Sequence, residues 1–256
     1  VTATEPNDDI ASAVELGAGD ACATSDNQQA GQDIYRWTVP ESVTPQTWTL
    51  SLTGVPGQVG VLEVYRVDTD DTGAIVAADK LASLLGAAGQ AVSLPDLLLL
   101  PGDYYLGAAF SGTGPYQLTV DAGTSLPEPV DADPARVADA FAVSGQSGDT
   151  GIEIDWEITG NGEADRHDLT IQGPAGVPYT WSLLDPDGAS IATGTGDIDG
   201  KSGFPDLGLS AGIYTISVIP GQPMPWVVTS NATGERSTSL EDEPNDSSAA
   251  SVQQIP

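Results

Sequence analysis

The sequence predicts an all-β protein built from two tandem antiparallel β-sandwiches of a jelly-roll-like kind. Three observations lead to this fold class. Short segments alternate apolar and polar residues, turns rich in glycine and proline separate them, and the same series of segments is written twice. The 30 glycines and 19 prolines among 256 residues favour many turns. No stretch of a dozen residues keeps the apolar spacing of a helix.

The first half of the chain supplies the clearest strands. The segment 33–39 alternates with a period of two and places Tyr35, Trp37 and Val39 on one face. Turn residues bound each of the later segments. Further strands are predicted at residues 48–53, 59–67, 91–94, 104–110 and 116–120. The best helical candidate is 77–88, which is short and broken by a glycine.

The second half repeats this pattern at a constant offset. Residues 154–158 match residues 35–39, which is an offset of 119 (154 − 35). After a shorter loop the offset becomes 110, as in the match of residues 226–228 to residues 116–118 (226 − 116). Because separate strands share one register, the sequence predicts two copies of one domain.

The chain therefore divides into four predicted parts. They are a first sandwich (1–121), a linker rich in proline, alanine and acids (122–134), a second, divergent sandwich (135–230) and a tail that starts a third repeat (231–256). Residues 243–246 of the tail, Glu-Pro-Asn-Asp, repeat residues 5–8 at twice 119 (243 − 5 = 238). We expect the chain to belong to a longer protein. The tail is expected either to hang loose or to fold back on the second sandwich and supply the segment that its start lacks.

The charge of the chain excludes several classes of partner. The formal net charge is −30, with only seven lysines and arginines. This charge argues against nucleic acid and anionic membrane surfaces as partners, because binding to either needs clustered basic residues. The single cysteine allows no internal disulfide. The sequence contains no run of about 18 apolar residues, so no membrane insertion is predicted. An acidic surface of this kind suits divalent cations, solubility in salt, or both.

The sequence predicts no catalytic residues. His167 is the only histidine, so the chain lacks the several histidines of a histidine-based zinc site and offers a catalytic triad no other imidazole. It falls at the edge of a predicted strand, where we expect a plain surface residue. No Gly-x-Ser-x-Gly elbow occurs, and the glycine-rich segments lack the lysine of a phosphate loop. Paired carboxylates of the kind used in glycoside hydrolysis stay open as an alternative, although with this many acids any pairing is expected by chance.

The aromatic residues allow two interpretations. Five tryptophans and seven tyrosines could form an exposed row that binds sugar or fibrous protein. Trp37, Trp156, Tyr104 and Tyr214 lie in strands matched by the repeat, and we predict them to be core residues. For Trp48, Trp181, Tyr179 and Trp226 both interpretations stay open.

Four motifs follow one another along the first half of the chain. They are Glu5-Pro6-Asn7-Asp8, Asp33-Ile34-Tyr35-Arg36-Trp37, Pro101-Gly102-Asp103-Tyr104-Tyr105 and Gly112-Thr113-Gly114-Pro115-Tyr116-Gln117-Leu118. In this order they resemble the bacterial pre-peptidase C-terminal (PPC) domain, a family that includes the collagen-binding domains of clostridial collagenases. The resemblance covers residues 3–120 and, more weakly, 135–230. It implies a jelly-roll-like β-sandwich without catalytic activity, found in secreted multidomain proteins that are often peptidases. It also implies calcium, which several members bind through the Glu-Pro-Asn-Asp segment.

A calcium site needs about six to eight oxygen ligands, and the first motif offers three side chains in four residues. The proline biases the residue before it to an extended conformation, which turns neighbouring side chains to different sides. The resemblance adds the acid before the aromatic strand. The predicted site comprises Glu5, Asn7, Asp8 and Asp33, with Asp9 or Asp26 as a further oxygen donor.

A structural alternative and one exclusion accompany this site. The motif can equally be a stiff turn in which Asn7 or Asp8 caps a short helix. In the second repeat, Ile152 stands where the first has Asp33 (152 − 33 = 119), so no calcium of this type is predicted there.

We therefore expect a calcium-stabilised, non-catalytic accessory or binding module, secreted or held at a bacterial cell surface. Its expected partners are an extracellular protein or polysaccharide and the other domains of its parent chain, and it is expected to be a monomer. The alternative is a structural repeat segment of a cell-surface adhesin or surface-layer protein, which the repeated motif in the tail favours.

Overall fold

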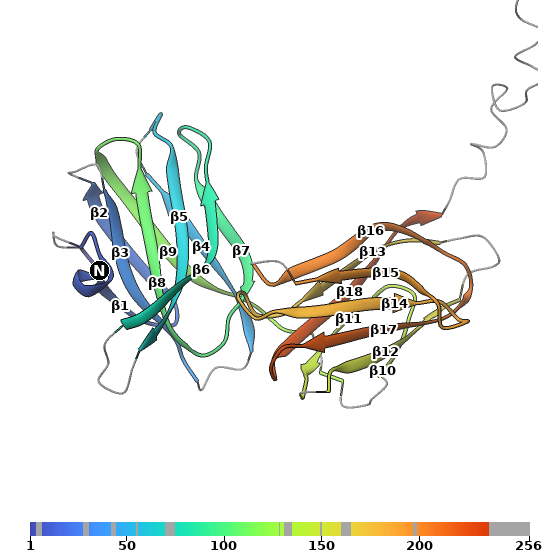
Figure 1. Ribbon diagram of the computed structural model, residues 1–256. Helices are drawn as coiled ribbons and strands as arrows, with labels where there is room; N and C mark the ends of the chain where they lie inside the picture. The colour runs from blue at the N-terminus through green and yellow to red at the C-terminus, as the bar shows by residue number, and fades with distance from the viewer. Residues whose placement is uncertain are drawn as a thin grey trace, which may run out of the picture.

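A computed structural model confirms the all-β fold class. It describes residues 1–3, 7–27, 31–41, 45–54, 56–69, 75–127, 129–130, 135–148, 150–159, 165–196 and 199–235. Within these ranges the chain forms eighteen strands and one short 3-10 helix, η1 (Ile10–Ser12). The strands lie in two β-sandwiches, blue to green and yellow to red in Figure 1. Of the predicted tail (231–256), residues 231–235 belong instead to the last strand of the second sandwich, and the remainder lies outside the described ranges.

The first sandwich pairs a five-stranded sheet with a four-stranded sheet. Their orders are β1-β3-β8-β5-β6 and β2-β9-β4-β7. The strands are β1 (Val14–Ala18), β2 (Ala21–Asn27), β3 (Gln32–Val39), β4 (Gln46–Thr53), β5 (Gly60–Thr69), β6 (Ile75–Leu85), β7 (Val92–Leu98), β8 (Gly102–Phe110) and β9 (Gly114–Ser125).

The second sandwich repeats this arrangement with the orders β10-β12-β17-β14-β15 and β11-β18-β13-β16. Its strands are β10 (Ala135–Ala138), β11 (Phe141–Gln146), β12 (Ile152–Ile158), β13 (Asp165–Gln172), β14 (Tyr179–Leu184), β15 (Ser190–Thr195), β16 (Lys201–Leu209), β17 (Gly212–Pro220) and β18 (Pro225–Glu235). Pairing is antiparallel except that β1 runs parallel to β3 and β10 to β12. In both cases the intervening strand, β2 or β11, lies in the other sheet. The chain therefore returns to the five-stranded sheet running in the same direction as the strand that left it.

Strand pairing confirms the alignment of the two repeats. Trp37 pairs with Tyr104 across β3 and β8, and Trp156 pairs with Tyr214 across β12 and β17. All four residues are buried, as the sequence predicts. Each tryptophan anchors its own core, and the two cores form separate clusters of buried side chains.

His167 is not the surface residue that its position predicts. Only 1% of it is exposed, and its ring meets Trp156 edge to face, with ring centroids 5.1 Å apart. In the first sandwich the same place holds Trp48, whose ring meets Trp37 at 5.0 Å. An aromatic ring is needed there to fill the core, and the histidine supplies it.

The helical candidate at 77–88 is also wrong. Most of it belongs to β6, an edge strand that pairs with β5 along its length. The alanines and leucines of this segment suit a helix, but pairing with β5 satisfies the backbone of the segment and overrides local preference.

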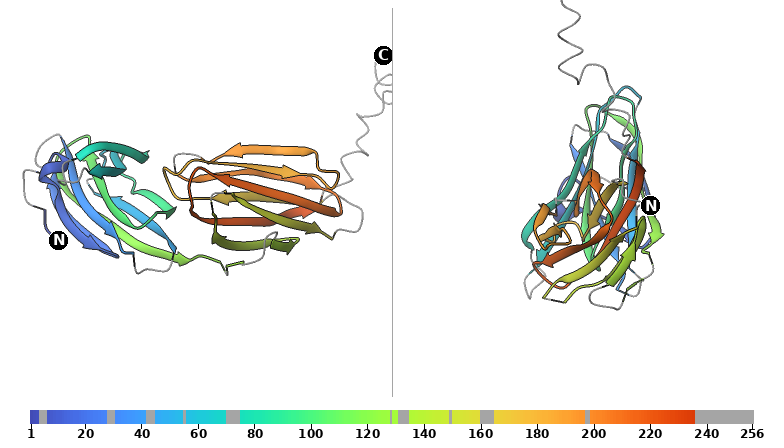
Figure 2. Two further views of the ribbon diagram at one scale, coloured as in Figure 1. Left: turned by 60° about the horizontal axis from the view of Figure 1, so that its bottom comes forward. Right: turned by 90° about the vertical axis from the view of Figure 1, so that its right-hand side faces the viewer.

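The sandwiches lie end to end and touch through the edge strand β7 (Figure 2). The Ala175 N–H donates to the Leu98 carbonyl at 2.9 Å, and the side chains of Gln172 and Lys201 donate to the carbonyls of Asp96 and Pro95. Strand β9 runs four residues into the predicted linker before the chain crosses to the second sandwich (125 − 121).

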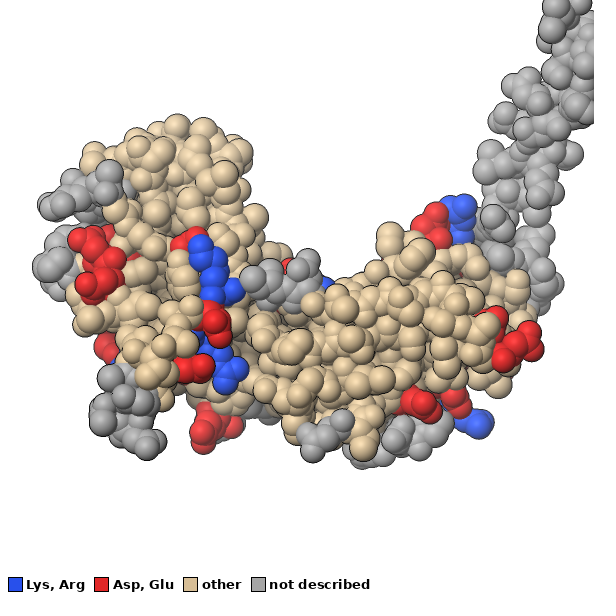
Figure 3. Space-filling view, viewed as in Figure 1, with Lys and Arg blue, Asp and Glu red and all other residues tan. Residues whose placement is uncertain are grey.

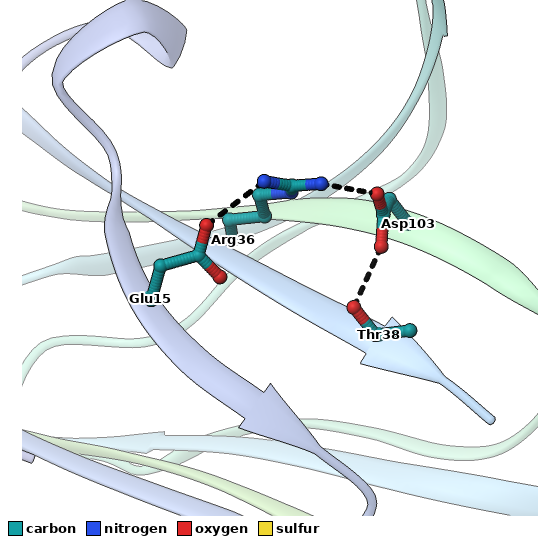
Figure 4. A network of polar contacts seen from close by, with 4 residues as sticks. All are labelled: Glu15, Arg36, Thr38 and Asp103. Carbon is teal, nitrogen blue, oxygen red and sulfur yellow. Dashed lines mark hydrogen bonds and ion pairs between the residues drawn. The ribbon is translucent and has the colours of Figure 1, made fainter.

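The charged residues spread over the surface. On the face shown in Figure 3, acidic side chains are scattered over both sandwiches, and much of the second is uncharged. On the first sandwich, Arg36 joins two acids from neighbouring strands, Glu15 at 2.9 Å and Asp103 at 2.5 Å (Figure 4). Asp103 also accepts a hydrogen bond from Thr38 at 2.6 Å. This network ties β1, β3 and β8 together on the outer face.

Candidate metal site in the first sandwich

The structure brings Asn7, Asp8 and Asp33 together at the start of β3. The N–H of Ile34 donates to the Asn7 carbonyl at 2.7 Å, which fixes the N-terminal segment against the strand. Asn7 is fully buried and Asp33 is 3% exposed. Asp8 is exposed, and its carboxylate lies close enough to Asp33 for the two charges to repel.

Asp33 belongs to a buried chain of polar groups. The Tyr116 hydroxyl donates to its carboxylate, and the hydroxyls of Tyr35 and Tyr116 are 2.6 Å apart. Burial raises the pKa of Asp33; a hydrogen bond from Tyr116 opposes this, and the nearby Asp8 adds to it. Burial and the contact with Asp33 likewise raise the pKa of Tyr116. The site therefore holds negative charge where water supplies little stabilisation.

The side-chain amide of Asn7 is the least satisfied group of the site. Both its oxygen and its nitrogen are buried, and neither has a hydrogen-bond partner in the described part of the chain. Leaving such a group unpaired costs about 1–3 kcal/mol, so native structures rarely keep one without a reason. A bound cation would satisfy the oxygen.

The other predicted oxygen donors divide into two groups. Asp9 caps η1 by accepting from the Ser12 hydroxyl at 2.7 Å and from the Ser12 N–H at 2.8 Å, and these two hydrogen bonds lower the pKa of the Asp9 carboxyl. The helix cap of the structural alternative therefore exists, but Asp9 forms it, and neither Asn7 nor Asp8 does. Glu5 lies outside the described residues, as does the side chain of Asp26.

The donor set is short of carboxylates. No three residues among histidine, cysteine, aspartate and glutamate gather as a metal site in the described ranges. The carboxylates of Asp8 and Asp33 lie near each other, and Asn7 belongs to the segment that bonds to β3 beside Asp33. The side-chain oxygens of these residues are hard donors, which suit calcium rather than zinc. A complete shell needs further oxygens from Glu5, the backbone or water.

The sequence did not reveal Tyr116 and Tyr35 as parts of this site. Tyr116 lies in β9, on the sheet opposite Asp33, and only the packing of the two sheets joins them. The second sandwich has lost the arrangement. Trp226 takes the place of Tyr116, and Ile152 that of Asp33, so the described residues there form no such polar chain.

All five tryptophans are buried, which rules out an exposed tryptophan platform. Trp48, Trp181 and Trp226 are each at most 3% exposed, and Tyr179 is 2% exposed. The positions left open by the sequence are therefore core positions.

Comparison with known proteins gives no family. No family model matches the chain, and no curated protein matches it. Among solved structures, the PBSX exported protein XepA is 11% identical over 83% of this chain and 85% of its own, with a TM-score of 0.30. The CBM22-1–CBM22-2 tandem domain of Paenibacillus barcinonensis Xyn10C is 13% identical over 82% and 93%, with a TM-score of 0.26. The major capsid protein P2 of bacteriophage PM2 is 10% identical over 85% and 98%, at 0.28. Similarity this low supports no conclusion about function.

The described part of the chain holds no helix with the length and apolar character needed to cross a bilayer.

Proposed function

We propose that the chain is a non-catalytic binding module of a larger secreted protein and that calcium stabilises its first sandwich. The observation that carries the calcium assignment is the buried, unpaired amide of Asn7, in a segment that bonds to the residue after Asp33 and places Asp8 near that acid. Glu5 is the fourth proposed ligand. The cation would neutralise Asp33 and hold the N-terminal segment against β3.

Thermal unfolding in millimolar CaCl₂, in MgCl₂ and in EDTA tests this proposal. Ligand binding raises the stability of the native state by RT ln(1 + [L]/Kd), about 2.7 kcal/mol at 100 times Kd. We expect calcium, and not magnesium, to raise the unfolding temperature of the first sandwich and to leave that of the second unchanged. Asn7→Ala and Asp8→Ala should each reduce this rise, whereas Asp121→Asn, an exposed acid elsewhere in the first sandwich, should not. A rise of equal size in all variants would refute the site.

The ligand of the module is proposed to be an extracellular protein or polysaccharide. A protein that carries no exposed tryptophan row must recognise it through other side chains. Co-sedimentation with insoluble collagen and with insoluble polysaccharides, in calcium and in EDTA, tests this part. Failure to bind any of them in either buffer would favour a spacer over a binding module.

A second function, a repeat segment of a cell-surface adhesin or surface layer, is favoured by the contact between the sandwiches. Leu81, the bulge residue of β6, is buried where the Gly173–Val177 loop of the second sandwich docks. Its counterpart in the second sandwich, Ile191, is the bulge residue of β15 and is 46% exposed (191 − 81 = 110). The second sandwich therefore presents the surface on which a further repeat would dock.

The docking surface can be tested by adding a repeat. A second copy of residues 122–235 is fused behind residue 235, and unfolding of the middle sandwich is compared with that in the parent chain. A docked third unit should raise the unfolding temperature of the middle one, and Ile191→Asp should abolish the gain. No gain in the unmodified fusion would mean that the repeats do not stack.

A further inference from the structure

A cleft of about 560 Å³ opens in the second sandwich beside the chain that enters it. Strands β11, β12 and β18 form its walls, together with residues 126–127 and 129–130. Its apolar lining comes from Leu126, Pro129, Val130, Ile152, Ile154 and Trp226. The volume falls within the range of about 300–1,000 Å³ that is usual for small-molecule sites.

This cleft occupies the place that the Asn7 segment fills in the first sandwich. Both halves enter through the same contact, since the Ala3 N–H donates to the Thr24 carbonyl and the Val130 N–H to the Ser144 carbonyl. From there the first half takes 11 residues to reach β1 (14 − 3), but the second takes 5 to reach β10 (135 − 130). The second sandwich therefore lacks six residues that would cover this region.

The residues that line the cleft also differ in chemistry from the matching residues of the first sandwich. Ile152 replaces the buried acid Asp33, and Gly145 lies where the first sandwich has Ser25, which hydrogen-bonds to that acid. A Cβ at Gly145 would come within 2.5 Å of the Trp226 ring, so only glycine lets the indole lie against β11. The polar site of one half has become an apolar cleft in the other.

One polar group of the cleft wall lacks a partner. Trp226 is 2% exposed, and its indole N–H makes no hydrogen bond to any described residue. A buried indole N–H usually finds an acceptor. By contrast, the indole N–H of Trp181 donates to Ser202 at 2.7 Å.

We propose that the cleft is a binding site for a small, mainly apolar molecule that carries one hydrogen-bond acceptor for the Trp226 N–H. An apolar ligand fits because its burial against these walls is favourable, whereas an anionic one would lose its hydration and meet Glu153 but no basic side chain in the lining. For the same reason the Glu-Pro-Asn-Asp segment at 243–246 is a poor occupant. In the first sandwich Asp8 lies near Asp33, to which Tyr116 and Ser25 hydrogen-bond, and none of these three partners is retained here.

The test uses the full chain and the fluorescent probe 6-propionyl-2-dimethylaminonaphthalene, an uncharged aromatic molecule with a carbonyl acceptor. Binding is followed by fluorescence and by the five tryptophan indole N–H resonances. We expect saturable binding of one probe per chain and a shift of one resonance, which Trp226→Phe removes. Ile152→Trp should fill the cleft and abolish binding, and near-ultraviolet circular dichroism reports whether that variant keeps its fold.

Matched variants distinguish binding of the probe in the cleft from non-specific binding elsewhere on the protein. Trp226→Phe keeps the ring but removes the donor, and should weaken binding roughly tenfold if the hydrogen bond contributes as such bonds usually do. Trp181→Phe makes the same change at an equally buried position of the same sandwich and should leave binding unchanged. Equal binding by all variants, or shifts of several indole resonances, would overturn the proposal. So would binding that appears only after removal of residues 236–256, because the tail would then be the natural occupant.

Discussion

At the scale of single residues, Asp33 carries its charge where water hardly reaches, so its effect on stability depends on the cation. In EDTA near pH 7, Asp33→Asn removes the burial cost of the charge and the repulsion from Asp8 while keeping an acceptor for Tyr116. The variant should therefore unfold at a higher temperature than the parent. In CaCl₂ the order should reverse, because the parent gains a ligand that the variant has lost. Melting curves in the two buffers measure the difference in unfolding temperature between the parent and the variant. If the same protein is the more stable one in both buffers, calcium binding at Asp33 is contradicted.

The pH dependence of the same residue has a defined sign. The folded-state pKa of Asp33 lies above its ordinary value of 3.8, so its protonation favours the folded state. In EDTA the parent should gain stability relative to Asp33→Asn as the pH falls through the folded-state pKa towards 3.8. Urea unfolding of the two proteins at several pH values isolates this contribution from the other carboxylates. A constant difference across that range would mean that Asp33 is not desolvated.

His167 gives the second sandwich an opposite response to acid. Burial lowers the pKa of this histidine below 6.5, so the unfolded chain takes up the proton first. Stability should fall as the pH drops from about 6.5 to the folded-state pKa, by at most about 1.4 kcal/mol per pH unit. His167→Phe keeps an aromatic ring against Trp156 and should remove this loss. Urea unfolding at pH 7.5, 6.5 and 5.5 checks it, and an unchanged slope in the variant would place the acid sensitivity elsewhere.

At the scale of secondary-structure elements, the sequence predicted most strands of the first sandwich because alternation survives where one face is buried. The pattern of β3 places Tyr35 and Trp37 in the core, and both are fully buried. The prediction from alternation failed at β6, because the exposed alanines and leucines of this edge strand hide the alternating pattern. Of the candidate site, the sequence placed Asn7 and Asp33 together only through a family resemblance. The contact of Asp33 with Tyr116 depends on how two sheets stack, which no local pattern encodes.

The parallel edge strand β1 depends on the network of Arg36. The Arg36 side chain joins Glu15 of β1 to Asp103 of β8, but all three side chains are about 40% exposed or more. Solvent screening therefore limits each ion pair to about 1 kcal/mol or less. Arg36→Met should leave global unfolding nearly unchanged while speeding amide exchange in β1 more than in β5. Equal exchange in both proteins would show that backbone pairing alone holds the edge.

At the scale of the whole molecule, the two sandwiches behave as one body only if the loop at Gly176 stays docked. This glycine has a φ of +75°, and a Cβ there would collide with Leu81 of the first sandwich. Gly57 occupies the matching position of the first sandwich with a φ of +78°, but a Cβ there would meet open space. The two glycines share one backbone conformation and differ only in their neighbour.

This pair allows strain to be separated from docking. Gly57→Ala and Gly176→Ala should each strain a loop to a similar degree, because both force a side chain into the left-handed region. Only Gly176→Ala should also push the sandwiches apart, uncouple their unfolding transitions and increase the maximum dimension measured by X-ray scattering. If both variants keep the parent dimension, the contact at Leu81 does not hold the sandwiches together. The hydrogen bonds from Gln172, Ala175 and Lys201 to β7 would then be sufficient, and the surface around Ile191 would lose its role as a docking site for a further repeat.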